Sequence, residues 1–225
     1  MTLTLCRDLS PADWIVHSVL PWQQLVGFGP AGFDAYARVR FLPDPMRPGQ
    51  SENDVEADWR LDQLPTLWDV LATHTAADDC YFCVWEGFGP SELDGDNDAA
   101  YVDDESAVTK TTDAQPGLAP KRTSSSSNTW LPKVVVPNRA YWLFRGPLSD
   151  VGSWDTAQDL PRTIRLEAAE PAFVWPADHV WCVALDVDQH WAGIGADSPL
   201  ITKLTSDPRL DVVTADPTQG PPFYQ

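Results

Sequence analysis

A polar stretch from Ser91 to Thr129 most constrains how this chain can fold. Seven acidic and no basic residues lie between Glu92 and Glu105, and four consecutive serines follow at 124–127. Such a segment cannot bury enough apolar surface to offset the entropy that its ordering would cost. We therefore predict a long disordered, acidic and Ser-rich insertion over 91–129. The sequence on both sides of it must then fold together as one domain, which we place over residues 1–225.

The flanking sequence is dominated by strand patterns. Phe33–Leu42 alternates apolar and polar residues with a period of two, which predicts a half-buried strand. A turn at Pro137-Asn138 between two apolar runs predicts a hairpin. Further strands are predicted in 80–86, 163–168, 180–195 and 210–215.

Only two segments favour helices, 64–75 and 197–207. In the second, Ser198 is the predicted cap and Pro199 lies in the first turn. Strands and helices do not alternate regularly. The predicted class is therefore α+β, with a mainly antiparallel sheet and a few short helices.

The tetrapeptide Gly-Phe-Gly-Pro occurs twice, at 27–30 and at 87–90, and each copy closes an apolar run. Because glycine allows positive φ and proline cannot continue a central strand, we interpret both copies as turns that end strands. The alternative is a pair of loops whose backbone approaches a ligand closely. It would gain support if Phe28 and Phe88 lined one cleft, so both are candidate binding residues.

Charge narrows the classes of partner. With 15 basic and 33 acidic residues the formal net charge is −18, which repels nucleic acid and anionic membranes. We expect another protein as the partner, and a basic one would be attracted by complementary charge. The N-terminus lacks the pattern of a signal peptide and no long apolar run is present, so we expect a cytoplasmic protein with its four cysteines reduced.

Three patterns could hold metal, and each has a simpler explanation. Cys80, Cys83, His179 and Cys182 have zinc-like spacing, but residues three apart on a strand point to opposite faces. The acids of 94–105 match calcium-loop positions, yet Ala99 stands where that loop needs glycine. If Asp186, Asp188 and His190 continued a strand, they would face one way and could hold a metal that activates water. A hairpin turn over 186–189 is the favoured interpretation.

No paired nucleophile and base is visible, so we assign no catalytic residue and expect no cofactor. Eleven tryptophans are spread along the chain, and we expect most of them to fill the core. The best binding candidate is Arg139–Gly146. There Arg139, Tyr141 and Arg145 share one strand face, which could form a patch that binds acidic groups.

The phrases PWQQLVGFGPAGFDAYARVRFLPDP, CYFCVWEGFG, YWLFRGPL and VWCVALDVDQHWAGIG resemble an uncharacterised family of actinobacterial proteins. That resemblance implies no activity, cofactor or catalytic residue. In layout, the final DVD…WAGIG…SPLITKL…LDVV unit is similar to bacterial immunity proteins of the SMI1/KNR4-like group.

These observations favour a non-enzymatic binding protein that recognises a partner through an acidic surface or an aromatic cleft, as an immunity or regulatory factor. The alternative is a metal-assisted hydrolase that uses Asp186, Asp188 and His190.

Overall fold

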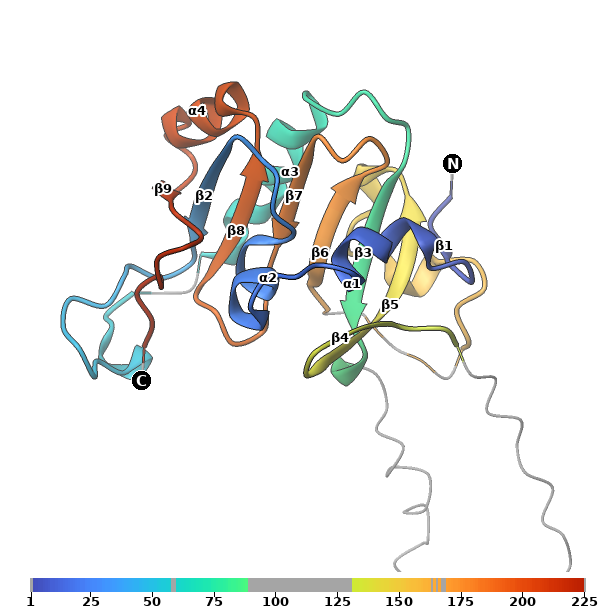
Figure 1. The fold of residues 1–225 in the computed structure, drawn as a ribbon, viewed down its shortest axis with the longest axis horizontal. Helices are drawn as coiled ribbons and strands as arrows, with labels where there is room; N and C mark the ends of the chain where they lie inside the picture. Colours follow the sequence, from blue (N-terminus) through green and yellow to red (C-terminus); the bar gives the residue numbers. More distant parts are fainter. Residues whose placement is uncertain are drawn as a thin grey trace, which may run out of the picture. The chain divides into compact units, whose positions relative to one another are not determined.

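One antiparallel sheet organises the chain (Figure 1). The computed structural model describes residues 2–57, 60–88, 131–162, 164, 166 and 169–224. Nine strands of these residues pair in the order β1-β5-β3-β6-β7-β8-β2-β9, with β4 paired to β5. The strands are β1 (Thr4–Leu5), β2 (Ala35–Arg40), β3 (Cys80–Trp85), β4 (Val134–Val136), β5 (Arg139–Gly146), β6 (Pro171–Pro176), β7 (Trp181–Ala184), β8 (Trp191–Ala196) and β9 (Val212–Ala215).

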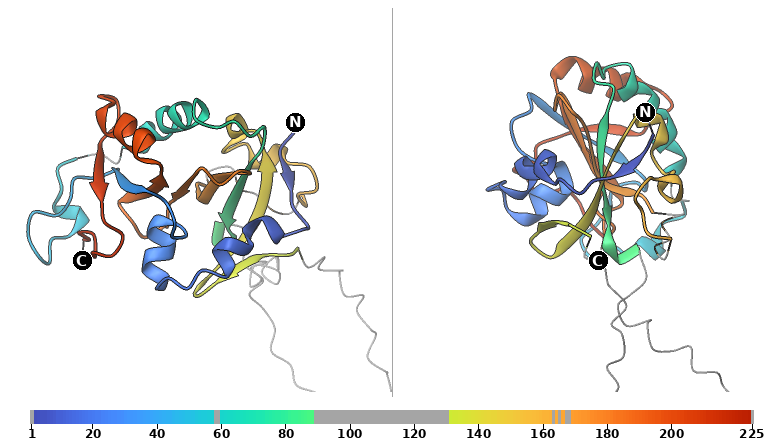
Figure 2. Two further views of the ribbon diagram at one scale, coloured as in Figure 1. Left: turned by 45° about the horizontal axis from the view of Figure 1, so that its top comes forward. Right: turned by 90° about the vertical axis from the view of Figure 1, so that its right-hand side faces the viewer.

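Short helices cover the sheet on both sides. The described α-helices are α1 (Asp13–Val16), α2 (Trp22–Phe28), α3 (Leu64–Ala72) and α4 (Ser198–Ser206). In the right-hand view of Figure 2, α1 and α2 lie on one side of the sheet and α3 on the other. We call the side under α1 and α2 the α2 face. The predicted α+β class with a mainly antiparallel sheet is confirmed.

Glycines on β8 let α2 lie directly on the sheet. A Cβ built on Gly193 would be 1.9 Å from the carbonyl oxygen of Gly27, and one on Gly195 would be 2.3 Å from the Phe33 ring. Both distances are far below contact, so only glycine fits while α2 and Phe33 keep their places. Gly27 therefore approaches the protein's own sheet and not a ligand.

The opposite face is built on large apolar side chains. Trp154 packs against Phe82 and Phe144 with ring centroids 5.6 and 5.3 Å apart, and it is fully buried. Beside them, Trp181 donates its Nε1–H to Thr75, just beyond α3, at 3.0 Å. Most tryptophans are thus core residues, as predicted, and the sheet is buried on both faces.

The two Gly-Phe-Gly-Pro copies end different elements. The first closes helix α2, where Gly29 has φ +78° and its N–H donates to the Leu25 carbonyl at 2.8 Å. Our assignment of this copy to the end of a strand is wrong. The apolar run of α2 buries Leu25, Val26 and Phe28 as a helix, and the left-handed glycine ends it. The second copy follows β3, as predicted, through a 3-10 turn over Glu86–Phe88.

Other boundaries also differ from the sequence predictions. Asp197 and not Ser198 caps α4, since its carboxylate accepts from the Leu200 N–H at 2.8 Å. Within 163–168, Ile164 and Leu166 are described and lie outside any strand, whereas β6 was not predicted. The insertion predicted over 91–129, including its calcium-like pattern at Asp94, Asp96, Asp98 and Glu105, lies outside the described residues.

Candidate functional site

Strand β5 places three of the five predicted binding residues on the α2 face. Arg139, Tyr141 and Arg145 share this face with Leu143, which pairs with Cys83 on β3. Tyr141 is 1 % exposed and belongs to a core cluster with Ile15 of α1. The pKa of Tyr141 is raised, chiefly by burial and also by the nearby Cys83 and Asp186. Arg139 lowers it by less. The middle of β5 is therefore covered by helix α1, and a binding role for Tyr141 as a surface group is wrong.

At one end of β5, Arg139 is held by charge and by aromatic rings. Its Nε and Nη2 donate to both oxygens of Asp186 at 3.1 and 3.3 Å, and Nη2 also donates to Asp188 at 2.6 Å. The guanidinium carbon lies 5.5 Å from the Trp22 ring centroid and 5.4 Å from that of Trp85. Burial alone would lower the pKa of Arg139, but the hydrogen bonds and charges of the two aspartates raise it. The guanidinium is thus fixed in position and always charged.

The two aspartates that hold Arg139 differ in exposure. The Asp186 side chain is 6 % exposed, whereas that of Asp188 is 73 % exposed. Asp186 begins the turn between β7 and β8 and Asp188 lies within it, and the Gln189 N–H donates to the Asp186 carbonyl at 3.2 Å. The predicted hairpin turn is confirmed. This turn breaks the two-residue repeat of an extended strand. His190 therefore does not join Asp186 and Asp188 at Arg139.

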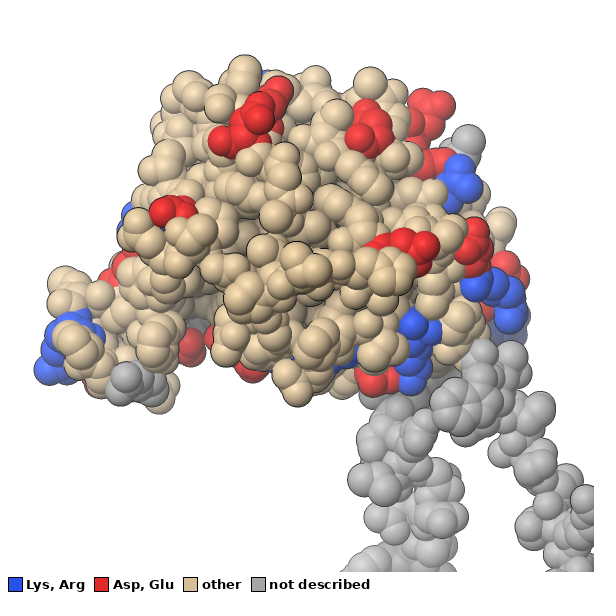
Figure 3. Space-filling model, in the orientation of Figure 1, with Lys and Arg blue, Asp and Glu red and all other residues tan. Residues whose placement is uncertain are grey.

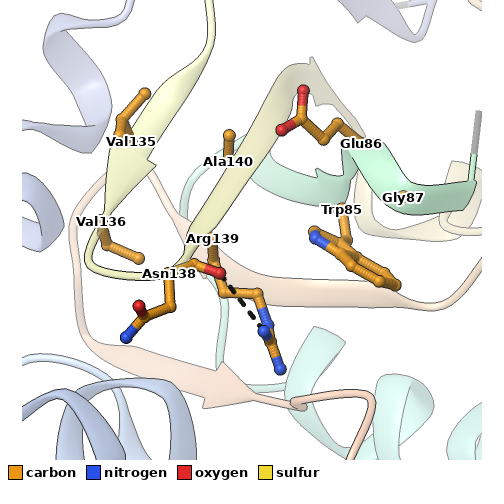
Figure 4. A pocket seen from close by; sticks show the side chains of 8 residues that line it. All are labelled: Trp85, Glu86, Gly87, Val135, Val136, Asn138, Arg139 and Ala140. Atoms are coloured by element: carbon orange, nitrogen blue, oxygen red, sulfur yellow. Dashed lines mark hydrogen bonds between the residues drawn. The ribbon is translucent and has the colours of Figure 1, made fainter. Parts of the chain in front are cut away.

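An open cleft of about 480 Å³ lies beside Arg139 (Figure 4). Its lining comes from the end of β3, the following turn and the β4–β5 hairpin, and consists of Trp85, Glu86, Gly87, Val135, Val136, Asn138, Arg139 and Ala140. Glu86 is paired with Lys133. The charged groups of this cleft are therefore neutralised largely within the chain, and its open surface is mainly apolar and aromatic.

The edge of the cleft is strand β4. A two-residue turn with Asn138 at φ +64° pairs Val136 with Arg139 and Val134 with Tyr141. In such a hairpin the backbone groups of Val135 point away from β5. Within the described residues, β4 pairs with β5 alone, and the Val135 side chain is 61 % exposed.

At the other end of β5, Arg145 lines a second cleft of about 640 Å³, formed mainly by polar residues of the N-terminal segment and of β3 and β5. Arg145 donates from Nε and Nη2 to one oxygen of Asp79, at 2.9 and 2.5 Å. The predicted acid-binding groups thus already bind acids from this chain. Cys6 also lines the cleft, and burial raises the pKa of its thiol to about 11, so it is not a reactive thiolate near neutral pH.

The remaining candidates lie apart from this cleft or outside the described residues. Phe28 is a core residue, 2 % exposed and 5.0 Å from the Trp191 ring, and the side chain of Phe88 lies outside the described part of the chain. Cys80, Cys83 and Cys182 are buried free thiols, and burial raises the pKa of each. The fourth member of the zinc-like pattern, His179, stacks on Trp14. Among the described residues, no three His, Cys, Asp or Glu side chains are grouped so that they could hold a metal.

His190 belongs to an ionic cluster that the sequence did not reveal. Its Nε2 lies 3.5 Å from Oδ1 of Asp44, and Arg38 donates to both Asp44 oxygens at 2.8 and 3.0 Å. Burial lowers the pKa of His190 more than Asp44 raises it. Burial raises the pKa of Asp44, but Arg38, Arg40 and His190 together lower it. Asp44 lies in the Pro-rich connection that follows β2, where no local sequence pattern indicates its role.

This cluster predicts a loss of stability in acid. A histidine with a lowered pKa takes up a proton more readily when unfolded, so the free energy of unfolding should fall as pH drops below 6.5. It should fall further below pH 3.8, as Asp44 is protonated. Urea unfolding over a pH series should show a smaller decline between pH 6.5 and the Asp44 range in His190→Gln. The decline should not vanish, because burial also lowers the pKa of His179. An unchanged decline in His190→Gln would contradict this assignment.

No described helix has the length and apolar composition needed to cross a membrane. Comparison with protein-family models, with curated protein sequences and with solved structures found no match to this chain.

Proposed function

We propose that this protein is a non-enzymatic binding protein that recognises a peptide segment of a protein partner along strand β4, next to the cleft that Trp85 and Arg139 line. The observation that carries the proposal is a cleft that combines an aromatic ring with an immobilised guanidinium and is lined on one side by strand β4, whose other edge is unpaired within the described residues. Tryptophan and arginine dominate the hot spots of protein interfaces. The cleft volume also falls within the range of about 300–1,000 Å³ that is typical of ligand sites.

The form of the partner segment follows from β4. Outward backbone groups at Val135 can pair with an extended peptide, as in other cases of strand addition to a sheet edge. Apolar side chains on one face of that peptide would contact Val135, which shares its face of the sheet with Ala140, whereas Trp85 lies on the other face and across β5. Because Arg139 is already paired with Asp186 and Asp188, apolar contact and backbone pairing supply the affinity, and a carboxylate on the peptide does not.

The net charge of the chain also affects which partners it would attract. The net charge of −18 would attract a basic partner from a distance and orient it before the cleft is engaged. A cytoplasmic immunity or regulatory factor fits this behaviour.

Selection of a displayed peptide library on the full chain tests the proposal. We expect enrichment of extended sequences with apolar residues at alternate positions. Val135→Asp should weaken their binding at least about tenfold, because it places a charge beside the apolar edge. Met46→Asp is the matched control, since Met46 is 92 % exposed and follows β2, towards the other end of the sheet. If no peptide is enriched, or if both variants bind equally well, the proposal is wrong.

A further inference from the structure

The cleft of about 640 Å³ at the Arg145 end of β5 has a floor made by three strands. Thr4 of β1 and Tyr81 of β3 each pair with Arg145 of β5, so the three side chains lie in one row on the α2 face. Residues between β1 and α1 also line the cleft, as does Gln158, which is hydrogen-bonded to the β1 segment. We call this site the Tyr81 cleft. Its charged and aromatic lining consists of Arg7, Asp8, Asp79, Tyr81, Arg145 and Asp159.

Tyr81 gives this floor a fixed aromatic ring. The ring stacks on that of Trp175, with centroids 5.7 Å apart and 24° between the planes. Trp175 is fully buried, so Tyr81 rests on the core. Tyr81 itself is only partly buried, and within the described part of the chain its hydroxyl makes no hydrogen bond. It therefore offers a ligand both an apolar body and an unpaired polar tip.

Charged groups of both signs line the same cleft. Arg145 donates from Nε and Nη2 to Asp79, which leaves its Nη1 without a partner among the described residues. Arg7 is exposed and forms no ion pair with any described residue. Asp8 and Asp159 supply carboxylates that no described lysine or arginine binds. Figure 3 shows blue and red side chains next to one another at the end of the molecule where β1 lies. The cleft thus holds both unpaired donors and unpaired acceptors.

This mixture of charges disfavours a charged ligand. An anion would face three carboxylates, and a cation would face two guanidinium groups. A hydroxyl group avoids both conflicts, because it can donate to a carboxylate and accept from a guanidinium. A sugar carries several hydroxyl groups and also has apolar C–H groups that can pack against an aromatic ring.

From these observations we infer that the Tyr81 cleft binds a neutral sugar. Arg7 and Arg145 donate to its hydroxyl oxygens, the unpaired carboxylates accept from its hydroxyl groups, and Tyr81 contacts its ring. The pairing of Arg145 with Asp79 suits such a ligand, because a hydrogen bond to a neutral hydroxyl needs no net charge in the cleft. The cleft volume also falls within the range of about 300–1,000 Å³ that is typical of small-molecule sites. This inference is independent of the proposed peptide site, which lies at the other end of β5.

Amide chemical shifts of the isotope-labelled full chain, measured while sugars are added, test the inference. The probes are glucose, galactose and mannose, each with two analogues in which the primary alcohol group is converted to a carboxylate or replaced by an amine. We expect at least one neutral sugar to shift the amides of Arg7, Tyr81 and Arg145 at millimolar concentrations. Its two charged analogues should bind at least about threefold more weakly, because each meets groups of its own sign at an exposed site.

Two arginine variants form a matched pair. Arg145→Lys keeps a positive charge beside Asp79 but removes the planar guanidinium, so the affinity for the neutral sugar should fall at least about tenfold. Arg209→Lys is the control, because Arg209 also donates from Nε and Nη2 to one aspartate, Asp207, and its side chain is 61 % exposed against 51 % for Arg145. Tyr81→Phe removes only a hydroxyl group and should also weaken binding. Unchanged thermal midpoints would confirm that the variants keep the fold.

The methyl glycoside of the sugar that binds distinguishes a free sugar from the end of a glycan. Retained affinity for the glycoside would identify the terminal sugar of a glycan as the ligand, and lost affinity would identify a free sugar. Three results would overturn the inference. In the first, no neutral sugar shifts the amides of the cleft. In the second, a charged analogue binds more tightly than its neutral parent. In the third, Arg145→Lys binds the sugar as the wild type does.

Discussion

Gly193→Ala should lower the free energy of unfolding by about 3 kcal/mol, at the upper end for an overpacked core. The new Cβ would lie 1.9 Å from the Gly27 carbonyl oxygen and 2.9 Å from the Phe28 ring. Backbone cannot move aside as the end of a flexible side chain can. Helix α2 would have to lift from β8, which would expose Leu25 and Val26 to water.

Chemical denaturation of Gly193→Ala and of a matched glycine variant measures this effect. Gly220→Ala is the control, because a Cβ built there meets nothing within 4 Å and the residue has no positive φ. The control should unfold like the wild type. If Gly193→Ala also unfolds at the wild-type midpoint, α2 does not rest on β8 as described.

Asp186→Ala should cost about 3 kcal/mol of stability, the lower end of the range for breaking a buried ion pair. Asp186 accepts from both Nε and Nη2 of Arg139, and its removal leaves that cation between two indole rings with only Asp188. The lower end applies because Asp188 remains in contact. We expect the cleft to lose its shape as well, since Arg139 forms part of its wall.

Asp188→Ala provides the comparison for the same guanidinium. Its side chain is largely exposed, and exposed ion pairs contribute about 0–1 kcal/mol. Thermal or urea unfolding of both variants at neutral pH should therefore separate them clearly. Equal losses from the two substitutions would mean that burial does not determine the strength of this ion pair.

Local sequence patterns predicted much of the sheet. The period of two identified β2, and the Pro137-Asn138 turn identified the β4–β5 hairpin. These features depend on neighbours along the chain, which a sequence pattern can report. The alternation in β2 nevertheless misjudged Arg38, which is buried. Arg38 is buried because its face of β2 is also covered: its guanidinium lies 5.4 Å from the Trp191 ring and donates to Asp44.

Two elements were missed for identifiable reasons. Helix α2 contains Gly27 in its last turn, and glycine is a poor helix former, so an apolar run that ends in Gly-Phe-Gly-Pro resembles a strand end. What favours the helix is contact with Gly193, more than 160 residues away along the chain, and no local signal reports that contact. Strand β6 begins and ends with proline, which argues against a central strand.

Strand parity placed the site residues on the correct face but did not identify their partners. Arg139 meets Asp186 across 47 residues and Arg145 meets Asp79 across 66 residues. Because of these pairs, acids of the same chain neutralise the arginines at the two ends of β5. The arginines therefore do not form the acid-binding patch that the sequence predicted. Sequence spacing cannot show such long-range pairing, because it follows from the strand order β5-β3-β6-β7. The cleft beside Arg139 could not be predicted for the same reason.

Amide hydrogen exchange on the full chain, with and without a selected peptide, tests the cleft most directly. The proposed function predicts that added protection is confined to Glu86, Gly87 and the amides of 134–136 and 138–140, with the strongest effect at Val135. Those amides line the cleft or belong to the exposed strand edge. Protection that falls instead on helices α1 and α2, or a peptide that protects no amide near β4, would contradict the proposal.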